Sequence, residues 1–165
     1  MIADINLQNA TSVGQEAEKL QRKALPVQVD ISKEGDVNRM VGETLKYFGK
    51  IDILVNNADV GFGSHPGWEL IKDLTIENWQ NILNINLTGT FLCSKAVLAT
   101  MMKQRKGAII NISSALGKKG KAKYGAYTSS KFGIEGLSQV LSLELAPYTI
   151  SGSILLPRGV PQRQR

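Results

Sequence analysis

Short apolar runs alternate along this chain with segments in which apolar residues recur every three or four positions. The runs lie at 27–30, 51–56, 108–112 and 150–156 and, together with 1–4, have the lengths of strands. Helical spacing fills 6–20, 32–48, 75–104 and 124–145, with Asn6 and Ser32 as candidate N-caps and Gly49 as a helix end. Helices between near-continuous apolar strands predict an α/β fold, a doubly wound parallel sheet of about five strands.

Composition fits a single soluble domain. The 165 residues are 42% hydrophobic and 21% charged, values typical of a folded chain. The one cysteine, Cys93, excludes an internal disulfide and lies in a predicted helix, where we expect an inert core residue. No secretory signal is recognisable, and the apolar runs are shorter than the roughly 20 residues that cross a bilayer. We therefore expect a cytoplasmic protein with no membrane contact.

Tyr127 and Lys131 are the strongest candidates for chemistry. Four residues separate them in a predicted helix, so both side chains can leave the same face. A nearby ammonium favours the phenolate, and bringing a tyrosine pKa from about 10 to about 7 takes about 4 kcal/mol of preferential stabilisation. An ordinary helix with an exposed Tyr and Lys is the alternative. It is disfavoured because Ser114, Asn86 and the run Asn-Asn-Ala at 56–58 accompany the pair.

These residues together resemble the short-chain dehydrogenase/reductase family, whose members share a Ser-Tyr-Lys site and include 3-oxoacyl-acyl-carrier-protein reductases and alcohol, sugar and steroid dehydrogenases. The resemblance extends from Met1 to about Pro157 with the motifs in family order. It implies a Rossmann-like oxidoreductase that uses NAD(P) to interconvert a secondary alcohol and a ketone. The resemblance also implies that Tyr127 is the acid/base, that Lys131 lowers its pKa and holds the nicotinamide ribose, that Ser114 binds the substrate oxygen, and that Asn86 kinks its helix and orders a relay water.

The resemblance also places the cofactor. Asp4, at the end of what matches the family's second strand, would accept hydrogen bonds from ribose hydroxyls and repel a 2′-phosphate, which favours NAD over NADP. Asp4 as a plain turn residue is the alternative. Asp30 and Ile31 match the pair beside the adenine, and Asn57 and Ala58 match backbone that lies against the cofactor.

The chain departs from the family at three places. Its glycine-rich phosphate turn, with the first strand-turn-helix unit, has no counterpart, and neither has the C-terminal unit. The glycines at 61–67 imitate a phosphate turn, but Pro66 interrupts them, and we expect a flexible substrate-side loop. Asp59 replaces the family's Gly, which predicts backbone strain if φ is positive and repulsion of a diphosphate. We expect an incomplete Rossmann-like domain over 1–157 and a disordered tail over 158–165.

The net charge of +6 is concentrated before Tyr127, at lysines 118, 119, 121 and 123. A solvated loop is the simpler interpretation, and recruitment of an acidic or carrier-bound substrate is the sharper one. Nothing resembles a nucleic-acid motif, and His65 lacks partners for a metal site. The resemblance implies a homodimer or homotetramer through the helices that hold Asn86 and Tyr127. A catalytically incompetent fragment that acts at most as a dimerisation module is the alternative function.

Overall fold

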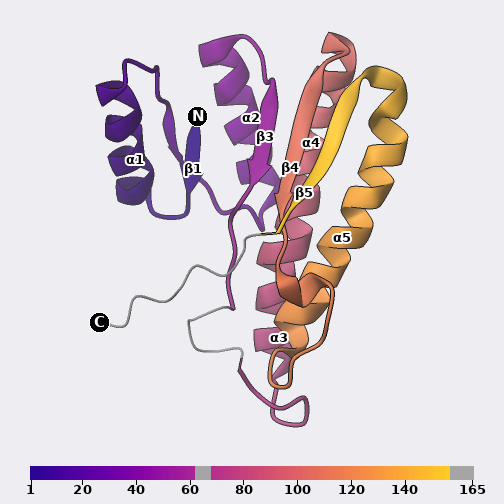
Figure 1. Cartoon of the computed structure of the whole chain (residues 1–165). Helices are drawn as coiled ribbons and strands as arrows, with labels where there is room; N and C mark the ends of the chain where they lie inside the picture. The colour runs from indigo at the N-terminus through magenta and orange to yellow at the C-terminus, as the bar shows by residue number, and fades with distance from the viewer. Residues whose placement is uncertain (62–67, 157–165) are drawn as a thin grey trace.

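The computed structural model describes residues 1–61 and 68–156 as an alternation of strands and helices (Figure 1). The predicted loop at 61–67 and the predicted tail therefore lie largely or wholly outside the described residues. The N-terminal elements are β1 (Ile2–Asp4), α1 (Leu7–Lys19), β2 (Pro26–Gln28), α2 (Glu34–Phe48) and β3 (Ile53–Asn56). The remaining elements are α3 (Ile76–Leu83), η1 (Asn84–Gly89), α4 (Thr90–Gln104), β4 (Gly107–Ile112), η2 (Ala115–Gly117), α5 (Gly125–Leu145), η3 (Ala146–Tyr148) and β5 (Ile150–Leu155).

Local sequence signals account for most helix ends. The Asn6 side chain accepts hydrogen bonds from the amides of Gln8 and Asn9, so the predicted cap of α1 is confirmed. Helix α2 ends, as predicted, at Gly49, whose φ of 75° is in the left-handed region. The predicted Ser32 cap is wrong, because α2 is capped by Lys33 without a side-chain bond and the Ser32 hydroxyl donates to Asp30 instead.

The strands form two parallel sheets instead of the single sheet predicted. β1 pairs with β2, while β4 lies between β3 and β5. Among the described residues no strand pairs with the second edge of β1 or of β3. Five parallel strands are thus confirmed, but the sheet is broken between β1 and β3, which stand apart in Figure 1.

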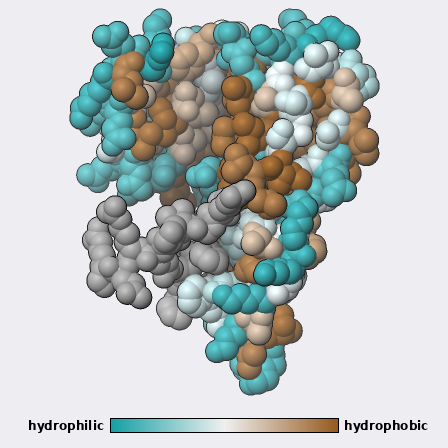
Figure 2. Space-filling model, viewed as in Figure 1, coloured by the Kyte–Doolittle hydropathy of each residue, from teal (hydrophilic) through white to brown (hydrophobic). Residues whose placement is uncertain are grey.

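One face of the three-stranded sheet is open. We expected β3 to be buried on both sides, yet Ile53 is 60% and Val55 52% exposed. Leu155 on β5 is 49% exposed, and Figure 2 shows apolar residues gathered over β3 and its neighbours. Alternate strand residues point to opposite faces, so Ile109 and Asn111 of β4 are buried against helices, while no described element covers the other face.

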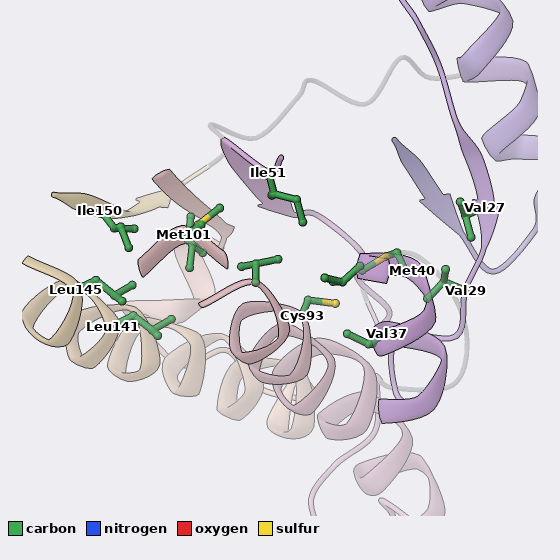
Figure 3. Close-up of a cluster of buried hydrophobic side chains, with 13 residues drawn as sticks. Val27, Val29, Val37, Met40, Ile51, Cys93, Met101, Leu141, Leu145 and Ile150 are labelled. Carbon is green, nitrogen blue, oxygen red and sulfur yellow. The ribbon is translucent and has the colours of Figure 1, made fainter. Parts of the chain in front are cut away.

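A single apolar core joins the two sheets. Helix α2 contributes Val37 and Met40, which belong to one cluster with Val27 and Val29 of the β2 segment and with Cys93 of α4 (Figure 3). Burial raises the pKa of the Cys93 thiol to about 11, so it stays protonated near neutral pH. The prediction of an inert core cysteine agrees with this environment.

The helical stretch Ile76–Gln104 is long and apolar enough to resemble a membrane span. Length and composition alone are weak evidence for a span. Val97 and Met101 of this stretch are almost fully buried in the core, and Asn86 is buried by polar partners. The stretch is therefore a core helix in this structure.

The close approach of η1, at Gly89, to the β2–α2 connection predicts opposite effects for two glycine substitutions. A Cβ on Gly89 would lie 2.7 Å from Ile31 Cδ1 and 3.3 Å from its carbonyl oxygen, whereas a Cβ on Gly42 in α2 meets nothing within 4 Å. We expect Gly89→Ala to lower the free energy of unfolding by about 1–3 kcal/mol. Gly42→Ala should raise it by about 0.5–1 kcal/mol because it restricts the unfolded chain. Urea denaturation measures both, and equal effects would contradict the packing at Gly89.

Candidate active site

Tyr127 and Lys131 lie together on the buried face of α5, as their spacing predicts. Tyr127 is 4% exposed and Lys131 is 1% exposed. The Lys131 ammonium lies 5.4 Å from the centre of the Tyr127 ring. A fully buried ammonium requires compensating partners, because removing a charge from water costs several kcal/mol.

Asp59, which follows β3, supplies the main compensation. Its Oδ1 lies 3.1 Å from Lys131 Nζ, and its Oδ2 accepts a hydrogen bond of 3.0 Å from the Tyr127 hydroxyl. Lys131 also donates to the carbonyl oxygen of Ile112, at 3.1 Å. A residue that the sequence marks only as a departure therefore stands between the two candidate catalytic groups.

The pKa of Tyr127 is raised in this arrangement. Burial is the largest cause, and the charge of Asp59 and its hydrogen bond add to it, while a hydrogen bond with Ser114 acts in the opposite direction. The predicted lowering of this pKa by Lys131 is therefore not found in this structure. The physical reason is that the Lys131 ammonium is paired with the Asp59 carboxylate and does not face the phenol alone.

Ser114 lies where β4 ends and η2 begins. It caps η2, and its Oγ accepts a hydrogen bond of 3.2 Å from the Leu116 amide. Its side chain also bonds Tyr127, so Ser114, Tyr127 and Lys131 meet at the carboxyl edge of the β3–β4–β5 sheet. Hydroxyl, phenol and ammonium within one site can bind and protonate a carbonyl oxygen.

Asn86 anchors the segment that carries Asp59. It lies in η1, a π-helical turn that interrupts the predicted continuous helix, and is fully buried. Its Oδ1 accepts from the Val60 amide and its Nδ2 donates to the Val60 carbonyl, each at 2.9 Å. Nδ2 also lies 3.2 Å from Ser130 Oγ, which donates to the Tyr127 carbonyl at 2.7 Å. The helix distortion expected of Asn86 is present, and its amide fixes the loop after β3 against α5.

Several polar contacts were not predicted from the sequence. Ser130 connects Asn86 to α5, but its place beside Lys131 in the sequence carries no signal of that role. Asn56 and Asn111 form a 2.8 Å hydrogen bond between β3 and β4, and Asn111 donates to Ser138 of α5 at 2.8 Å. The signal that could have predicted the Asn56–Asn111 bond is an asparagine at matching positions of two apolar strands.

The candidate adenosine residues lie at the ends of β1 and β2. Asp4 is partly exposed, and its Oδ1 accepts from the Asn6 amide at 2.8 Å, a contact that suits the turn role as well. The pKa of Asp30 is lowered, first by the Ser32 hydroxyl, and Lys33 lies 3.2 Å from Asp30 Oδ2. Ile31 packs on Gly89.

An open depression of about 380 Å³ lies beside Asp30. Its lining residues are Ile5, Gln28, Asp30, Lys33, Asp36 and Arg39. Neither Tyr127 nor Lys131 lines it. The structure thus separates the candidate adenosine residues, at and after the ends of β1 and β2, from the proton-transfer residues, which lie after β4 and on α5 beside the three-stranded sheet.

Asn57 and Ala58 follow β3 and are exposed, so their backbone is accessible at the same edge as Ser114. Asp59 is absent from the non-glycine residues of the described chain that have a positive φ. The conditional prediction of backbone strain at Asp59 therefore does not apply, because its φ lies in the region that all residues adopt.

Comparison with known proteins identifies the family. The family model described as short chain dehydrogenase matches residues 1–161. The chain belongs to this family. It is 35% identical over 135 residues to a 3-oxoacyl-[acyl-carrier-protein] reductase of Synechocystis, covering 82% of this chain and 53% of the relative. A 3-oxoacyl-[acyl-carrier-protein] reductase of Thermotoga maritima is 32% identical, with 93% and 61% covered.

Solved structures agree with this assignment. A crystal structure of NAD⁺-bound xylitol dehydrogenase matches with a TM-score of 0.89 and 31% identity, over 94% of this chain and 58% of that one. A metagenomic short-chain oxidoreductase in complex with NADP matches with a TM-score of 0.86 and 29% identity, over 96% and 70%. The predicted family and Rossmann-like fold class are confirmed. The chain spans little more than half the length of these curated relatives.

The lysine cluster before Tyr127 is partly engaged. Lys118 lies 2.7 Å from the buried Glu135 carboxylate, and Lys121 lies 4.5 Å above the Tyr124 ring. Lys119 and Lys123 are exposed. Within residues 1–61 and 68–156, no group of three His, Cys, Asp or Glu side chains is arranged to hold a metal ion.

The double hydrogen bond between Asn86 and Val60 gives a stability prediction. Asn86→Ala should lower the free energy of unfolding by about 1–3 kcal/mol, because it leaves partly buried backbone groups without partners. The Val60 amide should also exchange its hydrogen faster. Asn84→Ala, at an exposed position of the same turn, is the matched control and should change stability by less than about 0.5 kcal/mol. Urea denaturation and hydrogen exchange test both variants, and unchanged Val60 exchange would contradict the anchoring role.

Proposed function

We propose that this chain carries the proton-transfer site of an oxidoreductase that interconverts a secondary alcohol and a ketone with NAD. One observation carries the proposal: the convergence of Ser114, Tyr127 and Lys131 at the carboxyl edge of a parallel sheet. Membership of the short chain dehydrogenase family supports the reaction class.

Each of the three side chains has a distinct role in the proposal. Tyr127 donates its hydroxyl proton to the substrate oxygen in reduction and accepts it in oxidation. Ser114, already hydrogen-bonded to Tyr127, orients that oxygen. Lys131 stabilises negative charge that develops on Tyr127 once it is released from Asp59. Asn86 keeps the Asp59 segment and α5 in register rather than touching the substrate, as its bonds to Val60 and Ser130 indicate.

The fit of the described residues to NAD differs between its two ends. Asp4, Asp30 and Ile31 suit the adenosine end. Ile31 itself packs closely on Gly89. At the nicotinamide end, Asn57 and Ala58 offer exposed backbone, while Lys131 and Tyr127 are engaged by Asp59. The cofactor would supply the hydride. NAD is favoured over NADP by the Asp4 carboxylate, which would repel a 2′-phosphate.

An acidic or carrier-bound carbonyl compound is the proposed substrate class. Lys119 and Lys123 are exposed close to Tyr127 in sequence, and the curated relatives include 3-oxoacyl-[acyl-carrier-protein] reductases. Trp68 and Ile71 are exposed apolar residues near the same loop, since Trp68 lies 5.3 Å from Tyr124. A cytoplasmic location is part of this proposal.

Self-association is a second proposed activity. Phe91 of α4 and Phe132, Val140 and Leu143 of α5 are large apolar side chains with exposed fractions of 44–79%. They lie on the two helices that the family resemblance assigns to subunit contact. A homodimer or homotetramer would bury them, and a chain without turnover could retain this role as a dimerisation module. Light scattering after gel filtration, with Leu143→Glu as the disrupting variant, tests it.

The proton-donor role predicts the effect of one oxygen atom. Tyr127→Phe should lower kcat for reduction of a 3-oxoacyl thioester by NADH about 100-fold or more, because the general acid is removed. Affinity for NADH should change little, since the ring still packs. Absorbance at the NADH band measures turnover, and nucleotide fluorescence measures binding. Tyr148→Phe is the matched control, at a tyrosine outside the site. Full activity of Tyr127→Phe would sink the assignment.

The cofactor preference predicts the effect of one carboxylate. Asp4→Ala should shift the ratio of kcat/KM for NADH and NADPH toward NADPH by about tenfold, equivalent to about 1.4 kcal/mol. Asp52→Ala removes a carboxylate directly before β3, at the end of that strand away from the candidate site, and should leave the ratio unchanged. An unchanged ratio in Asp4→Ala would show that Asp4 is only a turn residue.

A further inference from the structure

We propose that Asp59 is a positioning residue that captures Lys131 and keeps Tyr127 protonated, so that the resting site is a proton donor. Both carboxylate oxygens are committed: Oδ2 accepts a hydrogen bond of 3.0 Å from the Tyr127 hydroxyl, and Oδ1 lies 3.1 Å from the Lys131 ammonium. The proton concerned is that of the Tyr127 hydroxyl, and its state can be measured without cofactor or turnover.

The hydrogen bond fixes the direction of the effect. Tyr127 is the donor and the ionised carboxylate is the acceptor, so the bond exists only while the phenol holds its proton. Ionisation of Tyr127 would place a phenolate beside a carboxylate at hydrogen-bond distance, and like charges that close disfavour ionisation. The Lys131 ammonium cannot offset this repulsion fully, because it is shared with Asp59 and with the Ile112 carbonyl.

Other polar groups around Tyr127 do not replace this control. Ser114 donates a neutral hydrogen bond to the Tyr127 oxygen, whose own proton is directed to Asp59, and this bond favours ionisation. Tyr124, in the same small cluster, carries Lys121 above its ring at 4.5 Å. Glu135, one turn beyond Lys131 on α5, is paired with Lys118 at 2.7 Å. Among the described residues, Asp59 is the carboxylate that reaches the phenol.

Asp59 lies outside the helices and strands. It follows β3 in a connection, its side chain is 28% exposed, and its backbone φ is not positive. The connection stays attached through the two bonds between Val60 and Asn86. Substitution at position 59 should therefore alter charge in the site while the connection stays attached, and it should also lower stability because the buried Lys131 ammonium loses its carboxylate partner.

If the chain has the proposed function, Asp59 also affects ligand binding. A ligand hydroxyl that is to reach Lys131 has to displace the carboxylate, so Asp59 competes with the ligand. At neutral pH the protonated Tyr127 is ready to donate, which favours carbonyl reduction over alcohol oxidation. Asp59→Asn should accordingly lower the pH at which alcohol oxidation begins.

The decisive experiment is a spectroscopic titration of tyrosinate, as the difference in absorbance between each protein and its counterpart that also carries Tyr127→Phe. In the unsubstituted chain this difference should show no ionisation of Tyr127 up to the pH at which circular dichroism reports unfolding. In Asp59→Asn it should show ionisation of Tyr127 at least about one pH unit below the pH of unfolding. Asp73→Asn, which removes an exposed carboxylate paired with Lys72, is the matched control and should behave as the unsubstituted chain.

Each outcome decides the proposal. Ionisation of Tyr127 together with ordinary tyrosines near pH 10 in the unsubstituted chain would overturn it before any variant is made. An identical titration in folded Asp59→Asn would overturn it as well. If Asp59→Asn fails to fold, Asp59→Gly takes its place, since it removes the carboxylate without adding a side chain. Absence of turnover in all these proteins would count against the proposed function and leave the titration result unaffected.

Discussion

The charge on Lys131 is the constraint around which the candidate site is organised. An ammonium that is 1% exposed is stable only with partners that repay its lost hydration. In this chain the partners are Asp59 and the carbonyl of Ile112, which come from the ends of two adjacent strands. The lysine thus ties α5 to the carboxyl edge of the sheet, and Tyr127 is carried into the same cluster one helical turn away.

Asn86 makes this arrangement possible from the other side. Its buried amide binds both backbone groups of Val60, so the connection after β3 cannot move away from α5 without breaking two hydrogen bonds. The π-helical turn around Asn86 turns that amide inward, because an inserted residue shifts the side chains of a helix relative to their neighbours. Asp59 is placed opposite Lys131 as the consequence of a packed polar network, and its own backbone is unstrained.

The sequence predicted the elements better than their assembly. Periodicity located all five strands and the long helices, and the spacing of Tyr127 and Lys131 predicted their shared face because both are local properties of a helix. The break between β1 and β3 and the state of Tyr127 depend on contacts between distant segments. Asp59 and Tyr127 are 68 residues apart in the sequence. No local pattern predicts that the Asp59 carboxylate pairs with the Lys131 ammonium.

The break in the sheet has a consequence for any ligand that spans both halves. The candidate adenosine residues Asp4 and Asp30 lie at the ends of β1 and β2, and the proton-transfer residues lie on α5 and after β4, beside the three-stranded sheet. Among the described residues backbone pairing does not connect the two sheets, so their relative position depends on α2 and on the shared apolar core. A ligand that binds both ends would favour one spacing of the two sheets and would stabilise the folded chain through that selection. Ligand affinity and the stability of the α2 packing should therefore be coupled.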